Sequence, residues 1–140
     1  MNENKLKHLE FIQNVITRMN TNSFLIKGWM VTIVAAVFVL AAKEEDPRFL
    51  LVVLFAVFVF WLLDGFYLSQ ERQYRDLYEA VRQKQEPTDF SMDATPYKIG
   101  RNTWQRAIFS WTTGLLYGPV ILLTLVLKCF MTHQGLAAVK

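Results

Sequence analysis

Residues 49–68 constrain the fold of this chain more than any other stretch. The first fifteen of them (49–63) carry no polar side-chain atom except the indole nitrogen of Trp61. A hydrocarbon core of about 30 Å needs about 20 helical residues at 1.5 Å each, and residues 49–68 supply that length. The sequence therefore predicts a transmembrane helix here.

This helix is expected to leave the membrane without a break. Asp64 begins a polar stretch, and no proline lies between Phe49 and Arg82. A seven-residue apolar repeat runs through residues 67–81 and is typical of packing on another helix. We predict a cytosolic helical extension over 69–85. A cytosolic loop should follow over 86–102, because that stretch carries two prolines and a glycine.

The chain before this helix divides into two predicted parts. Residues 1–22 form an amphipathic helix, because apolar residues recur at spacings of three and four. That helix either docks on another cytosolic helix or lies in the membrane interface, and its mixed charges favour docking. The polar residues 20–23 are expected to bend the chain or cap a new helix. Residues 24–42 then form a transmembrane helix with one charge, Lys27, near its start.

The two spans should form an antiparallel hairpin, because the polar residues 43–48, with Pro47, leave room only for a tight turn. A third apolar run covers residues 108–127. Asn102 and Gln105 have the spacing of a helix cap ahead of it. A full crossing and a re-entrant or peripheral helix are the alternatives for 108–127. The expected fold is an all-α membrane protein, a helical hairpin with a long cytosolic extension plus a third transmembrane helix.

The charges predict the orientation. The N-terminal part and the central segment together hold eleven Lys and Arg, against four in the hairpin turn and the C-terminal end. Cytoplasmic segments are enriched in these residues, and all four tryptophans lie near the same ends of the spans. We expect a multi-pass protein of a bacterial inner membrane, with the N-terminus cytoplasmic and the C-terminus outside. The first span should be retained, since its sequence lacks a signal-peptide cleavage pattern.

Lys27 and Asp64 are the first pair of candidate functional residues. Both lie near the cytoplasmic end of their spans, so an antiparallel hairpin brings them to similar depth. Opposite charges near the bilayer edge are expected to pair or to reach toward water. Two interpretations follow, a gate at the cytoplasmic mouth or an ion pair that fixes the register of the hairpin.

The third apolar run contains a polar stripe. At about 100° per residue its members fall within an arc of about 60°. They are Ser110, Thr113, Tyr117, Thr124 and Lys128. Gly114 and Gly118 lie beside the stripe with a spacing that permits close helix packing. The stripe is either a packing face inside one protomer or the lining of a narrow pore in an oligomer.

Several classes of function find no support in the sequence. A net charge of +3 is too small to argue for nucleic-acid binding. No glycine-rich phosphate loop, metal-ligand spacing or nucleophile–base arrangement is present, so we expect no enzyme, no catalytic or cofactor-binding residue and no metal site. His8 and His133 would lie on opposite sides of the membrane. The single cysteine, Cys129, excludes an internal disulfide.

The layout of residues 5–85 resembles a known family. A short cytosolic helix, two spans joined by a very short turn and a cytosolic helical extension are similar to the small bacterial two-span effectors called SLATT-type. The resemblance implies a pore-forming protein of a nucleotide-sensing or other anti-phage system. It implies no specific functional residue, and the third span lies outside that layout.

Two functional hypotheses follow. The first is a small oligomeric inner-membrane effector that permeabilises or perturbs the membrane when a cytosolic partner acts on its helices. The second is a non-conducting anchor or assembly subunit for a cytosolic protein. A transporter is not favoured, because the chain shows no repeated halves and no charge at mid-membrane. The expected partners are the lipid bilayer, further copies of the chain and a cytosolic protein, with no nucleic acid.

Overall fold

In a computed structural model, the described part of the chain covers residues 3–84 and 89–138, with side chains described to residue 134. This part of the chain is mostly helical and contains no strand. The elements are α1 (Glu3–Glu44), α2 (Phe49–Gln83), η1 (Thr95–Tyr97), η2 (Gly100–Asn102), α3 (Trp104–Ile108) and α4 (Trp111–Ala138). Helices α1, α2 and α4 are each long and apolar enough to span a membrane. The prediction of an all-α membrane protein is confirmed. Residues 1–2 and 85–88 of the predicted segments lie outside the described residues.

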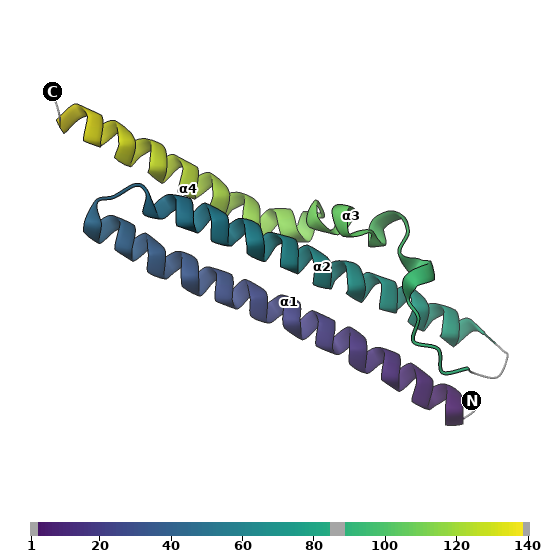
Figure 1. Ribbon diagram of the computed structural model, residues 1–140. Coiled ribbons are helices and arrows are strands. Elements are labelled where there is room, and N and C mark those ends of the chain that lie inside the picture. Colours follow the sequence, from purple (N-terminus) through teal and green to yellow (C-terminus); the bar gives the residue numbers. More distant parts are fainter. Residues whose placement is uncertain (1–2, 85–88, 139–140) are drawn as a thin grey trace.

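Helices α1 and α2 form the antiparallel hairpin and lie side by side along their length (Figure 1). Their 42 and 35 residues correspond to about 63 and 52 Å. At the turn Glu45 has a φ of +52°, and Asp46 pairs with Arg48 at 2.7 Å. Since a bilayer core takes only about 30 Å of each helix, both extend beyond it as a two-helix stalk.

One predicted boundary is wrong. The chain neither bends nor starts a new helix at residues 20–23, because α1 runs unbroken from Glu3 to Glu44. These four residues include no glycine or proline to end a helix, and the Ser23 hydroxyl is bonded to Asp64 on α2. The amphipathic segment and the first span are therefore two parts of one helix.

The stalk has a small core of its own. Ile12 and Ile16 of α1 pack with Leu77 of α2 and with Ala94 of the connection to α3. The N-terminal helix is thus docked on another helix, the first of the two predicted arrangements. The described residues 89–102 of the segment predicted as a loop pack on this core through Ala94 and contain both short 3₁₀ helices.

The third span differs from its prediction at its start. Helix α3 ends at Ile108, the chain turns at Phe109 and Ser110, and α4 begins at Trp111 rather than at residue 108. The predicted cap is also wrong, since Asn102 ends η2 and Thr103 precedes α3. Helix α4 continues past residue 127 to Ala138, which is long enough for a full crossing. It lies beside α2, and its C-terminal end extends past the hairpin turn (Figure 1).

Candidate functional site

The side chains of Lys27, Asp64 and Ser23 form a compact polar cluster between α1 and α2. The Lys27 ammonium donates to Oδ1 of Asp64 and to Oγ of Ser23, both at 2.6 Å. The Ser23 hydroxyl donates to the same Oδ1 at 2.5 Å. Ser23 and Lys27 are one helical turn apart, so they present their polar atoms to the carboxylate from the same face of α1. The structure thus brings the two charged candidates into contact.

The carboxylate of Asp64 is fully buried, and α4 helps to cover it. Its Oδ2 has no hydrogen-bond partner within the described residues. Tyr117 of α4 lies near enough to interact electrostatically with Asp64, and its hydroxyl donates to the Phe60 carbonyl at 3.3 Å. The cluster therefore lies where all three long helices meet. This geometry suits an ion pair that fixes the helix register, and a gating role stays a prediction.

The polar stripe of α4 faces the rest of the protomer. Thr113, Tyr117 and Thr124 are at most 1% exposed, whereas Ser110 and Lys128 are half-buried at the two ends. Tyr117 packs against Met30, Val34, Val53 and Val57. The stripe is therefore a packing face within one chain, and its three central members are shielded from any pore between chains.

An elbow between α3 and α4 seats the third span on α2. The indole of Trp61 donates to the Ile108 carbonyl at 2.9 Å, and the indole of Trp104 donates to the Leu62 carbonyl at 3.0 Å. The carbonyl of Ile108 also accepts from the Thr113 hydroxyl at 2.6 Å. The two bonds to the Ile108 carbonyl satisfy a backbone group that the break at Phe109 and Ser110 would otherwise leave unpaired near the membrane, and the Trp104 bond holds α3 on α2.

Gly65 makes the close contact at this elbow possible. A Cβ added there would lie 2.5 Å from Cγ1 of Ile108 and 3.1 Å from its Cα. The sequence reasoning missed this residue. The sequence did carry a signal, because Gly65 is the one glycine of its helix and directly follows Asp64, a predicted functional residue.

Gly114 and Gly118 are not used for packing within the chain. Both are exposed, and a Cβ added at either would meet nothing within 4 Å; Gly28 on α1 has the same property. The close approach predicted at Gly114 and Gly118 is therefore absent inside the protomer. Their faces of α4, like the Gly28 face of α1, are open to another molecule.

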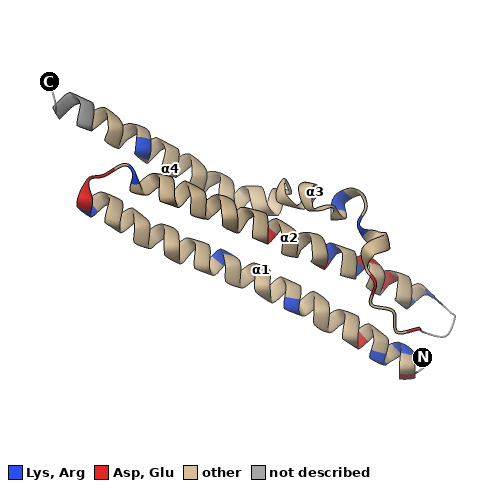
Figure 2. Ribbon diagram, in the orientation of Figure 1, with Lys and Arg blue, Asp and Glu red and all other residues tan. Residues whose placement is uncertain are grey.

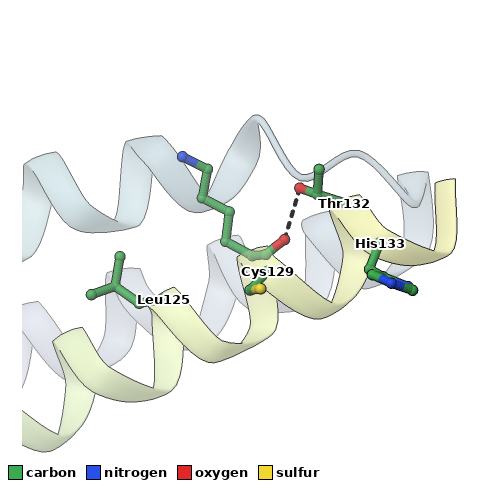
Figure 3. A pocket seen from close by; sticks show the side chains of 5 residues that line it. Leu125, Cys129, Thr132 and His133 are labelled. Carbon is green, nitrogen blue, oxygen red and sulfur yellow. Dashed lines mark hydrogen bonds between the residues drawn. The ribbon is translucent and has the colours of Figure 1, made fainter. Parts of the chain in front are cut away.

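A hollow of about 370 Å³ lies along the far end of α4 (Figure 3). Leu125, Lys128, Cys129, Thr132 and His133 line it, and the Thr132 hydroxyl donates to the Lys128 carbonyl at 2.8 Å. Cys129 and His133 are one turn apart, but two ligands do not make a metal site. Over the described residues, no group of three His, Cys, Asp or Glu side chains is placed to hold a metal ion.

A second polar cluster fixes the connection on the stalk. Asn102 is buried, and its amide donates to Oδ2 of Asp76 at 2.7 Å and to the Tyr97 carbonyl at 2.9 Å. Its backbone carbonyl accepts from the Ser69 hydroxyl at 2.6 Å. The sequence reasoning assigned Asn102 to a helix cap, so this role was missed. Its partners are far away in sequence, and no local pattern indicates them.

No protein-family model, no curated protein and no solved structure matches this chain.

Proposed function

We propose that this protein is a non-conducting, self-associating membrane anchor whose stalk holds a cytosolic protein. The observation that carries the proposal is the burial of Thr113, Tyr117 and Thr124 against α2. These residues form the only polar stripe in the three predicted spans. A conduit between protomers needs polar or charged groups that face it, or an apolar constriction that opens by wetting. With the stripe turned inward, the outer faces of the spans are predominantly apolar and suit lipid or further protein.

The stalk supplies the surface for a partner. Charged residues gather on the stalk half of the hairpin, on the connection to α3 and at the hairpin turn, while the spans between carry almost none (Figure 2). The outward face of α2 carries two intrahelical pairs, Arg75 with Glu71 and Arg82 with Glu79, both at 2.7 Å. The Arg82–Glu79 pair is exposed on both sides, and such pairs contribute little to stability, so it is free to exchange partners on binding.

The proposal includes the orientation and the location of the protein. The excess of Lys and Arg on the stalk side supports a cytoplasmic stalk and N-terminus and a C-terminus outside a bacterial inner membrane. Self-association rests on the exposed glycines, because Gly28 on α1 and the pair Gly114 and Gly118 on α4 offer two different faces for close helix approach. Two different faces suit a head-to-tail ring of protomers.

A pore-forming effector, as in the anti-phage systems implied by the SLATT-type layout, is the second candidate. The observation that favours it is the same pair of open glycine faces, since a ring of protomers encloses a central space. Its wall would be the apolar outer faces of the spans, so conduction would depend on wetting of an apolar constriction.

Membrane potential separates the two candidates. In cells expressing the protein, we expect the potential to match that of cells expressing an unrelated, non-conducting membrane protein at equal membrane abundance. Depolarisation by the wild-type protein, reproduced as ion flux from liposomes containing the purified chain, would contradict the anchor and support the pore.

Crosslinking tests the anchor directly. A photoreactive residue at Glu79, on the outward face of the stalk, should give adducts with a cytosolic protein. The matched control is the same residue at Phe55, which is exposed on the span and should give adducts with lipid or with the chain itself. Identical adduct patterns from the two positions would contradict a stalk that holds a partner.

A further inference from the structure

The region where the connection to α3 crosses α2 gathers arginines beyond what the fold uses. Arg72 of α2 donates from Nη1 to the backbone carbonyl of Arg101 at 2.8 Å, and the two guanidinium groups lie close enough for their charges to interact. Burial lowers the pKa of Arg72, and the neighbouring charge of Arg101 lowers it further, while Glu71 opposes the shift. Like charges held this close favour the binding of an anion between them.

The acids nearby are already engaged. Glu71 pairs with Arg75 at 2.7 Å. Asp76 lies 3.7 Å from Arg101, but its other oxygen accepts from the Asn102 amide at 2.7 Å. Among the described residues, neither Arg72 nor the exposed Arg106 of α3 is in an ion pair, and Arg101 shares the Asp76 carboxylate with Asn102. The cluster of Arg72, Arg101 and Arg106 is therefore net positive.

The depth of the cluster matches the phosphate layer of a bilayer. If the hairpin turn lies at one surface, a core of about 30 Å ends near Leu68 on α2. Arg72 lies one turn beyond that edge, and Arg101 is bonded to it. Arg106 lies on α3 between Asn102, whose carbonyl accepts from Ser69, and Ile108, which contacts Gly65. It therefore lies within about two helical turns of Arg72 along α2.

Exposed aromatic side chains mark the same boundary. Phe109 and Trp111 at the elbow are 77% and 82% exposed, and Trp104 is exposed beside them. Aromatic rings concentrate at the headgroup level of membranes, where Trp in particular is enriched. The lipid chains and the headgroup of one leaflet can therefore contact the elbow and the arginines together, whereas a soluble anion would use the arginines alone.

We infer that Arg72, Arg101 and Arg106, with the aromatic elbow of α3 and α4, bind the phosphate of an anionic phospholipid in the leaflet on the stalk side. Arginine forms paired hydrogen bonds to phosphate oxygens, and basic pockets at this depth between membrane helices recognise acidic lipid headgroups. The inference rests on the placement of the spans and holds for an anchor and for a pore alike.

The test is a titration of short-chain phosphatidylglycerol into the full-length protein in a neutral detergent, with phosphatidylcholine as the reference lipid. The wild-type protein should bind the anionic lipid more tightly. Arg101→Gln and Arg106→Gln should each weaken that binding about fivefold and leave the binding of phosphatidylcholine unchanged. Arg101 and Arg106 are exposed, so these variants should fold, and thermal unfolding without lipid checks this.

Arg18→Gln is the matched control. It removes the same charge from an exposed position of α1 at about the same depth, nine residues to the stalk side of Lys27, with no neighbouring arginine pair. Binding weakened equally by Arg18→Gln would mean only a diffuse surface charge and would overturn the site. So would competition by inorganic phosphate at similar concentration, which would indicate a soluble anion. Unchanged lipid binding in Arg101→Gln with loss of the Glu79 crosslink would assign the cluster to a protein instead.

Discussion

The ammonium of Lys27 lies 2.6 Å from Oδ1 of Asp64, and the two residues differ sharply in their access to solvent. The carboxylate is fully buried, whereas 32% of the lysine side chain is exposed. The lysine stem can therefore lie along the span while its charged end meets Asp64 at the membrane boundary. This pair, with Ser23, is the only polar tie between α1 and α2 at that depth among the described residues.

Removing one partner of this pair should cost more than removing both. Lys27→Met leaves the buried Asp64 carboxylate without its charged partner, although the Ser23 hydroxyl still donates to it, and an uncompensated buried charge costs about 3 kcal/mol or more. Lys27→Met/Asp64→Leu removes both charges and should recover most of that loss. Thermal unfolding of the single and double variants in one detergent measures the coupling. Additive losses would show that the two charges do not stabilise each other.

Gly65→Ala should displace the elbow. The added Cβ would approach Cγ1 of Ile108 to 2.5 Å, and the backbone of Ile108 lies just behind. Overpacking of this kind costs about 1–3 kcal/mol. Gly28→Ala is the control, because its Cβ meets nothing and alanine favours a helix by about 1 kcal/mol. Thermal unfolding should show a lower midpoint for the first variant and an equal or higher one for the second. A normal midpoint for Gly65→Ala would mean that the contact is not tight.

The three long apolar helices and the level of Lys27 with Asp64 could be predicted, because both follow from the length of apolar runs and from the short turn between them. The continuity of α1 could not, since residues 20–23 are common in caps and the partner of Ser23 is on another helix. Periodicity placed Thr113, Tyr117 and Thr124 on one face. It carries no information on which neighbour that face meets, so a packing face and a pore lining both remained open.

The connection on the stalk should loosen in acid. The hydroxyl and the backbone N–H of Thr95 bond to the Asp93 carboxylate and lower its pKa. A folded-state pKa below the unfolded value means that the stabilisation is complete above the unfolded pKa, near 4, and is lost as pH falls through the folded pKa. Protection of the Thr95 amide against hydrogen exchange, corrected for intrinsic rates, should therefore fall below about pH 4.

Asp93→Asn removes that titration but keeps an oxygen that accepts from the Thr95 amide, so the protection of Thr95 should no longer depend on pH. Asp89→Asn is the control, because Asp89 accepts from the Ser91 amide at 3.0 Å and should affect that amide alone. If the protection of Thr95 in the wild-type protein does not depend on pH, the Asp93 contact does not hold the connection.

Asn102→Ala should release the connection while leaving the spans intact. The substitution leaves Oδ2 of Asp76 and the Tyr97 carbonyl without their donor at a buried position, which costs about 1–3 kcal/mol. Limited proteolysis should then cut within residues 89–101 faster than in the wild-type protein, with the α1–α2 hairpin and α4 recovered whole. Gln105→Ala, at the other residue of the predicted cap, is exposed and should be cut at the wild-type rate. Equal rates for the two variants would mean that Asn102 does not hold the connection on the stalk. Faster cleavage inside the spans would mean that Asn102 stabilises the membrane part of the fold instead.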